Sequence, residues 1–289
     1  MDIMNNVKVS LEQNLELSQG VKANIYELTL IFNDRFPTVG LERYCQKLET
    51  LKIIRLSKFI KPGVVSMYDC RKNIIYLNSS EVEKGYDMKH VLMFELINVI
   101  SSNDIYTGFN IDDRYKVLNV GYTEILANLL VGNDSEISLY NQEAATVNML
   151  SILIGIETFY EAYFTNNFDL LAAKMVEVGA WIMGKIKDNN GVLKEFNKNN
   201  SLANLYFLNF ENTSPENWNE EDKNKYRASL RDMVVSVMEK CQDKNKIKLV
   251  KEALKDFDND LVNKPLTRDQ ANIIYNNKVQ KEKVTGRVK

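Results

Sequence analysis

The strongest constraint on the fold is a long central series of apolar residues at helical spacing. It begins at Asp87, a residue type that favours helix N-caps, and the helix predicted from there ends at the polar residues 101–104. Further apolar stripes follow over 119–131, 138–164 and 167–187, with few polar breaks between them. The central part of the chain therefore predicts a set of packed helices.

The N-terminal third has a different character. Helical spacing predicts one helix over 21–35 and a second over 41–51. The stretches GVVSMYD and NIIYLN then flank a short turn at 70–73, and their branched and aromatic residues predict an antiparallel β-hairpin. The fold class is therefore α+β and predominantly helical, with a small N-terminal mixed α/β section followed by a helical bundle.

Changes in composition divide the chain into four parts. Residues 1–86 form the mixed α/β section, and residues 87–210 form the helical section, in which the polar stretch 191–200 is predicted to be a loop. The stretch ENTSPENWNEE at 211–221 has the composition of a linker. Residues 222–289 are predicted to be a C-terminal helical section.

Within the C-terminal section, two helices are expected over 222–241 and 246–258, and a last one after Pro265. The chain ends in the basic stretch KVQKEKVTGRVK, which offers a weak contact for nucleic acid or acidic lipid, although a solvated terminus is the simpler interpretation. With 37 Lys and Arg against 39 Asp and Glu, the formal net charge is -2, so the chain as a whole has no electrostatic footprint for nucleic acid.

The sequence shows neither a targeting signal nor a cysteine motif. The first twenty residues contain no apolar signal segment, which favours a cytoplasmic protein, and the most apolar run, 147–156, is too short to span a membrane. Cys45, Cys70 and Cys241 are widely spaced, which is typical of buried thiols and not of a disulfide framework or a zinc knuckle.

His90 is the only histidine of the sequence, and this limits the chemistry severely. Catalytic triads and two-histidine zinc sites each need at least one imidazole in a defined place. We expect His90 to be an exposed or capping residue in the first turn of its helix, pointing away from Glu95, because residues five apart do not share one helix face.

The stretch FELIN at 94–98 has the spacing of a degraded zinc motif. In H-E-x-x-H, two histidines four residues apart present their rings to one metal ion, and the glutamate polarises the bound water. Here Phe94 and Asn98 occupy the two histidine positions, and Glu95 occupies the position of the base.

A second stretch, NVGYTE at 119–124, follows after a loop at 105–118. Together with FELIN and the preceding hairpin, it resembles the gluzincin type of the zincin metalloproteases, over roughly residues 50–165. The resemblance implies that Val120 stands in place of the third zinc ligand, a glutamate, and that Glu124 stands where an acidic residue orients a ligand histidine. A phenyl ring, an amide and an isopropyl group cannot hold zinc, so no metal cofactor is expected.

Several interpretations stay open. FELIN is also compatible with an ordinary buried helix segment, in which Glu95 would need a hydrogen bond from Asn98, Tyr122 or Arg114. The leading hypothesis is an inactive zincin-like pseudoprotease that binds a protein or peptide along the edge of the hairpin. The alternatives are an enzyme that uses the carboxylates of Glu95 and Glu124, and a purely structural helical protein.

Overall fold

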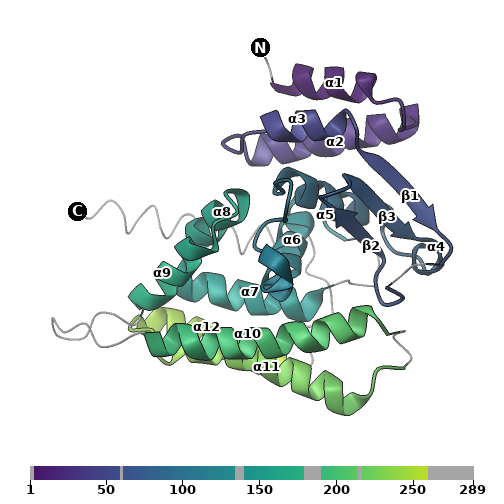
Figure 1. Ribbon diagram of the computed structural model, residues 1–289. Coiled ribbons are helices and arrows are strands. Elements are labelled where there is room, and N and C mark those ends of the chain that lie inside the picture. Colours follow the sequence, from purple (N-terminus) through teal and green to yellow (C-terminus); the bar gives the residue numbers. More distant parts are fainter. Residues whose placement is uncertain (1–2, 59–60, 134–139, 179–189, 214–216, 260–289) are drawn as a thin grey trace, which may run out of the picture.

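The N-terminal half of the chain combines helices with one small sheet. The computed structural model describes residues 3–58, 61–133, 140–178, 190–213 and 217–259 (Figure 1). The elements in the first half are α1 (Ile3–Gln13), α2 (Gln19–Arg35), α3 (Glu42–Leu48), β1 (Lys52–Leu56), β2 (Ser66–Asp69), β3 (Ile74–Asn78), α4 (Ser79–Val82) and α5 (Met88–Ile100).

The remainder of the described chain is helical. A 3-10 turn at Ile111–Asp113 precedes α6 (Lys116–Leu130), α7 (Asn141–Ile154), α8 (Ile156–Phe164), α9 (Phe168–Val178), α10 (Asn190–Glu211), α11 (Glu220–Met238) and α12 (Lys244–Asp258). The prediction of a predominantly helical α+β fold is therefore confirmed. Helix α1 and strand β1 were not anticipated from the sequence.

The sheet has three strands in the order β1-β3-β2. Strands β2 and β3 pair antiparallel, from Ser66 opposite Leu77 to Asp69 opposite Ile74, which confirms the predicted hairpin. Strand β1 pairs parallel to β3 on its other side. Both β1 and β2 are consequently edge strands, and β3 is the only strand paired on both sides within the described sheet.

Helix α5 begins and ends where the sequence predicts. The Asp87 side chain accepts hydrogen bonds from the backbone N–H groups of Lys89 and His90, so it caps the helix, and Ser101 forms its C-cap. Nine of the thirteen residues of α5 are buried, which is unusual for a helix and means that it runs through the interior.

Two predictions about the later helices are wrong. The stripe over 138–164 is not one helix, because Gly155 has a φ of 122° and separates α7 from α8. The stretch 191–200 is not a loop but the first half of α10. Although the stretch is mostly polar, Val192 and Phe196 are buried on one side of the helix. Two buried asparagines of α10, Asn200 and Asn204, donate hydrogen bonds to the backbone carbonyl of Arg114.

Other predicted segments agree with the structure or lie outside it. The helices predicted over 222–241 and 246–258 correspond to α11 and α12, and α10 ends at Glu211, where the linker-like stretch begins. The basic tail, the helix expected after Pro265 and the end of the stripe over 167–187 lie outside the described residues.

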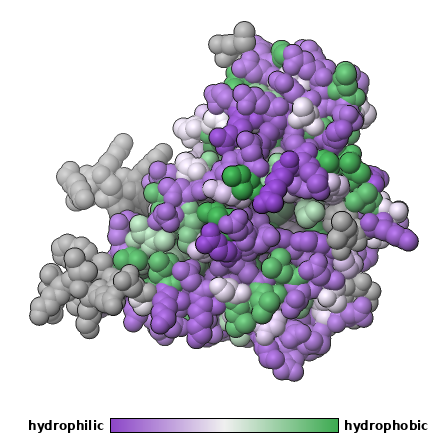
Figure 2. All heavy atoms as spheres, viewed as in Figure 1, coloured by the Kyte–Doolittle hydropathy of each residue, from purple (hydrophilic) through white to green (hydrophobic). Residues whose placement is uncertain are grey.

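The elements form three levels (Figure 1). Helices α1, α2 and α3 lie at the top of that view, the sheet with α5 and α6 in the middle, and α7 with α10, α11 and α12 at the bottom. Hydrophilic side chains cover most of the face seen in Figure 2, and hydrophobic ones are scattered over it in small groups. Among the described residues, no helix has both the length and the apolar character that a membrane crossing requires.

Helices α6 and α7 approach each other closely at Gly121. A Cβ atom added at Gly121 would lie 2.5 Å from the backbone oxygen of Glu143 and 2.9 Å from a methyl carbon of Val147. Real Cβ atoms do not come so near to a backbone atom, so only glycine allows the helices to pack at this distance.

We expect Gly121→Ala to lower the free energy of unfolding by about 1–3 kcal/mol, because the extra methyl group forces α6 away from α7. Chemical denaturation measures this change. The matched control is Gly20→Ala in the first turn of α2, where no heavy atom lies within 4 Å of the added Cβ, and where we expect an unchanged or slightly higher stability. Equal stabilities of the two variants would contradict the close approach.

Candidate functional site

A pocket of about 370 Å³ lies between the sheet and the helices. One wall is strand β2 with the turn that follows it, since residues 66–71 all line the pocket. The floor is formed by Phe94, Glu95 and Asn98 of α5 and by Val120 of α6. The structure therefore brings together the base position and all three positions that the sequence resemblance assigns to former metal ligands.

The apolar members of this floor are well packed. Phe94 is 4% exposed and Val120 is 7% exposed. The ring of Phe94 lies 5.3 Å from that of Tyr140, centroid to centroid, and Tyr140 also lines the pocket. The floor of the pocket thus carries aromatic and aliphatic groups where a metal site would need lone pairs.

Glu95 is buried and accepts hydrogen bonds from uncharged groups. The Ser66 hydroxyl donates to its Oε1 at 2.6 Å, and the Asn98 side-chain amide donates to its Oε2 at 3.2 Å. Burial raises the pKa of Glu95 to about 7, and the hydrogen bonds from Ser66, from Asn98 and from the backbone N–H of Tyr68 offset only part of that effect. The donor foreseen at Asn98 is present, whereas Ser66 of β2 was not foreseen.

The polar residues of NVGYTE hold Asn98 in place. Asn119 and Thr123 each direct a donor to the Asn98 Oδ1 atom at 3.4 Å, while the Asn119 Oδ1 atom accepts from the backbone N–H of Phe109 at 3.0 Å. The Thr123 hydroxyl also lies 2.6 Å from the Tyr163 hydroxyl. Asn98 is therefore the junction between Glu95 and the polar side of α6.

The expectation that His90 is exposed or merely caps its helix is wrong. His90 is 1% exposed, and its Nε2 atom lies 3.0 Å from a carboxylate oxygen of Glu124. Its Nδ1 atom lies 2.6 Å from the backbone oxygen of Gly132, so both ring nitrogens face acceptors and both can donate. Burial alone would lower the pKa of His90, but the Glu124 carboxylate outweighs it and the pKa is raised. The cause is a contact between α5 and α6 that spacing within α5 does not show.

Glu124 is consequently a structural partner and not a wall of the pocket. Its side chain is 0% exposed, and it also accepts a hydrogen bond of 3.0 Å from the Asn128 amide. The lining of the pocket includes Glu95 but not Glu124. The two carboxylates therefore do not face one cavity, as a catalytic acid–base pair would require.

A charged cluster at the pocket was missed by the sequence analysis. The Oε2 atom of Glu211 accepts from Lys61 Nζ at 2.8 Å and from Lys116 Nζ at 2.6 Å, and all three residues line the pocket. Burial lowers the pKa of Lys116, and the neighbouring Lys61 acts in the same direction. Nothing in the spacing of these residues signals the cluster, because Glu211 comes from the end of α10, far along the chain.

The rim of the pocket includes a loop with unusual backbone. Asp112 and Asp113 both have positive φ, at 50° and 59°, a region that residues other than glycine seldom adopt. Ile105, in the same loop, is 58% exposed and also lines the pocket. Cys70 lines it as well and is only half-buried, which departs from the expectation of three buried thiols.

No metal-binding cluster is found in the part of the chain that the structure describes. There, no group of three or more His, Cys, Asp or Glu side chains is arranged to hold a metal ion. Comparison of the chain with protein-family models, with curated proteins and with solved structures finds no match.

The raised pKa of Glu95 predicts a pH-dependent stability. With a folded-state pKa of about 7 against an ordinary value of 4.5, the stability that neutral Glu95 contributes is complete below about pH 4.5 and is lost as the pH rises through 7. Compared with Glu95→Gln, the wild type should lose on the order of 3 kcal/mol of unfolding free energy between about pH 5 and pH 8. Denaturant unfolding of both proteins across this range measures the difference.

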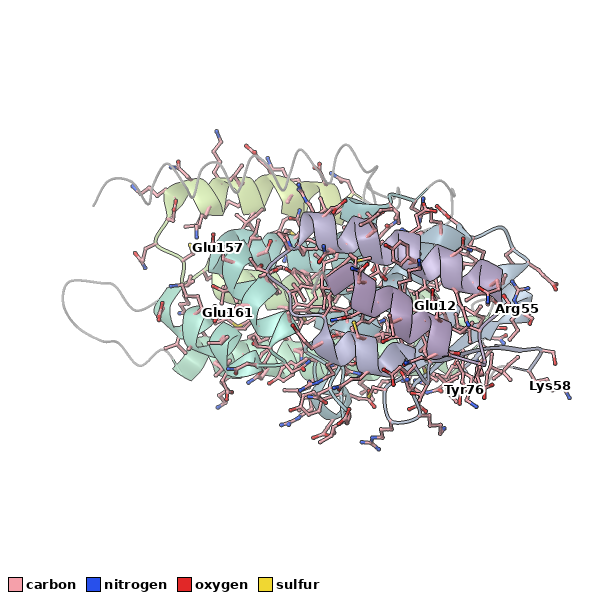
Figure 3. The ribbon with its side chains drawn as sticks, turned by 90° about the horizontal axis from the view of Figure 1, so that it is seen from above. Glu12, Arg55, Lys58, Tyr76, Glu157 and Glu161 are labelled. Carbon is pink, nitrogen blue, oxygen red and sulfur yellow. The ribbon has the colours of Figure 1, made fainter. Side chains whose placement is uncertain are left out.

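His90 and Glu143 also have raised pKa values, but both remain in each protein, so their effects cancel in the comparison. The control is Glu12→Gln, which removes an exposed carboxylate on α1 (Figure 3) and should give a profile parallel to that of the wild type. A profile of Glu95→Gln that also runs parallel to the wild type would show that Glu95 does not ionise in this range.

Proposed function

We propose that the chain is a zincin-like pseudoprotease whose former catalytic cleft binds an extended peptide segment of a partner protein without cleaving it. The main support is the pocket itself, which runs along an edge strand and has Phe94, Asn98 and Val120 in its floor. The three side chains that would have to bind zinc instead fill space or join a hydrogen-bond network.

Strand β2 has the backbone needed for strand addition. At one end of the hairpin, the Asn78 N–H donates to the Val65 carbonyl, and the register places Ser66 and Tyr68 at the alternate positions. In an antiparallel pair, alternate residues direct their backbone groups to the neighbouring strand, so Ser66 and Tyr68 direct theirs away from β3 and toward the pocket. The Tyr68 N–H already donates to the Glu95 carboxyl group, which leaves the other outward backbone groups of the strand for a peptide. An extended peptide can pair with such an edge.

The pocket also offers contrasting contacts for side chains of a bound peptide. Ile105 and Phe94 provide apolar surface, whereas Lys61, Lys116 and Glu211 form a partly buried charged group on the same lining. Main-chain pairing would supply affinity, and this contrast would supply selectivity among peptides.

The relationship to the zincins can be tested by restoring the missing ligands. In the variant Phe94→His, Asn98→His, Val120→Glu, two imidazoles and a carboxylate line the same pocket beside Glu95. We expect this variant to bind one zinc ion per chain, measured by titration calorimetry and metal analysis, and to be less stable than the parent because polar groups replace packed ones.

The control for restoration is the variant with glutamine at the same three positions, which has similar polarity but no good zinc ligands. We expect it to bind no zinc. If the restored variant folds and also binds none, positions 94, 98 and 120 do not share the geometry of a metal site, and the proposed relationship fails.

Peptide binding is tested directly with a displayed library of linear peptides. A selected binder is synthesised with its backbone N-methylated at one position at a time. Strand addition predicts that methylation weakens binding at one set of alternating positions by about tenfold and is tolerated at the other set, since only alternate N–H groups face β2. Mass spectrometry should show the peptide intact after incubation.

Protein variants locate the site. Val120→Phe fills the floor of the pocket and should weaken the selected peptide, while Leu249→Phe on α12, where Leu249 is 46% exposed, should not. An affinity that is insensitive to N-methylation at every position, or that is unchanged by Val120→Phe, would exclude binding along β2. Cleavage of the peptide would exclude the pseudoprotease.

A further inference from the structure

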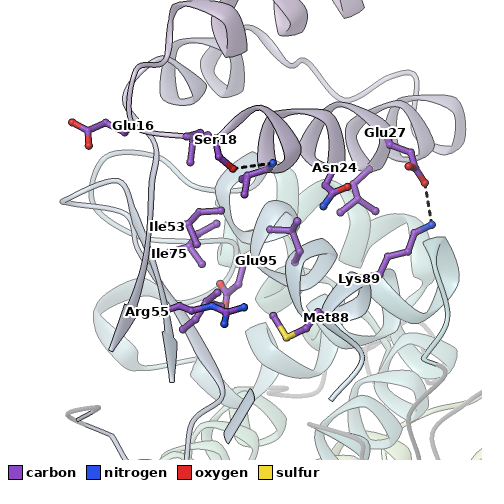
Figure 4. A pocket seen from close by; sticks show the side chains of 15 residues that line it. Glu16, Ser18, Asn24, Glu27, Ile53, Arg55, Ile75, Met88, Lys89 and Glu95 are labelled. Atoms are coloured by element: carbon purple, nitrogen blue, oxygen red, sulfur yellow. Dashed lines mark hydrogen bonds and ion pairs between the residues drawn. The ribbon is translucent and has the colours of Figure 1, made fainter. Parts of the chain in front are cut away.

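A second and larger cavity, of about 600 Å³, lies on another side of Glu95. It is enclosed by α2, by the helix-facing side of β1 and β3, and by α5 (Figure 4). Its lining surface is mainly apolar and includes Leu28, Ile53, Ile75, Leu77 and Leu92, but the charged residues Glu16, Glu27, Arg55, Lys89 and Glu95 line it too. Cavities of this size that are mainly apolar are typical of sites for small molecules, whereas protein cores are otherwise closely packed.

One wall of the cavity is a face of the sheet. Ile53 is in register with Ile75, and Arg55 is in register with Leu77, so these four side chains lie on the same face of the sheet. Position 55, which is exposed, carries an arginine, whereas the other three positions are aliphatic. The Arg55 side chain extends from β1 into the pocket (Figure 4).

The charges around the cavity are paired, with one exception. At its rim, Lys89 pairs with Glu27 at 3.1 Å, and Glu16 pairs with Lys52 at 3.0 Å. Glu95 is bonded to Ser66 and Asn98. The side chain of Arg55, an exposed residue at the edge of the cavity, has no ion pair or hydrogen bond within the described residues, although its guanidinium carries five donors.

We propose that this cavity binds an aliphatic carboxylate, with its hydrocarbon chain between α2 and the sheet and its carboxylate on Arg55. The apolar lining accounts for the chain, and the unpaired guanidinium accounts for the anionic end, because an arginine matches a carboxylate with two parallel hydrogen bonds. A cationic amphiphile would gain nothing from Arg55, and its binding is one of the outcomes that the test distinguishes. This site is separate from the proposed peptide cleft and does not depend on it.

The test uses three probes with the same chain: decanoate, decanol and decylamine. Calorimetric titration of the whole protein should give saturable binding of decanoate to one site, weaker binding of decanol and none of decylamine. Arg55→Gln should weaken decanoate about tenfold and leave decanol unchanged. The control is Lys58→Gln, which removes an exposed cation from the same end of the molecule as Arg55 (Figure 3) and should change neither.

A second variant tests the place of the hydrocarbon chain. Val21 of α2 lines the cavity, so Val21→Trp should abolish binding of decanoate and decanol alike, whereas Val9→Trp, at a residue 50% exposed on α1, should not. If Val21→Trp does not fold, the affinity of Arg55→Gln for decanoate still tests the proposal. Equal affinity of wild type and Arg55→Gln for decanoate, or no saturable binding, overturns the proposal. A concentration-dependent dimer that Val21→Trp abolishes would make a second copy of the chain the occupant instead.

Discussion

The buried polar contact between α5 and α6 holds the centre of the molecule together. His90 of α5 donates to Glu124 of α6, and Asn98, two turns further along α5, receives donors from Asn119 and Thr123. None of these side chains is more than 8% exposed, so each would lose its partner without gaining water if the helices separated. Such a network tolerates one register of the two helices, and it fixes where the floor of the pocket stands relative to β2.

That register gives the pocket its chemical character. A site for zinc and a site without zinc can share the same backbone, because the difference lies in which side chains project at three positions. Here those positions carry a packed ring, an amide used in the network and a buried isopropyl group. Glu95 accepts hydrogen bonds from Ser66 and Asn98, and burial raises its pKa to about 7 in spite of these donors. The pocket therefore lies along an edge strand, and its acidic group is already hydrogen-bonded.

The sequence could predict those parts of the fold that depend on local pattern. The hairpin and the capped helix from Asp87 follow from spacing, turn residues and helix faces. That FELIN and NVGYTE line one pocket was expected only from the resemblance to the zincins. The pairing of His90 could not be predicted, because Glu124 lies 34 residues away and helix spacing says nothing about a neighbouring helix. The same holds for α10. Its asparagines are typical of a loop, and the acceptor that Asn200 uses in the helix, the backbone carbonyl of Arg114, lies far away along the chain. It also holds for the cluster of Lys61, Lys116 and Glu211.

Glu95 connects the two cavities in a way that neither cavity shows alone. It lines both the cleft along β2 and the aliphatic cavity under α2, and it is 1% exposed between them. Its charge is therefore a shared property of the two cavities. An anionic group bound in either cavity would favour the neutral form of Glu95, because like charges repel. By thermodynamic linkage, protonation of Glu95 then favours binding of that group in return, so pH acts on both cavities through one carboxyl group.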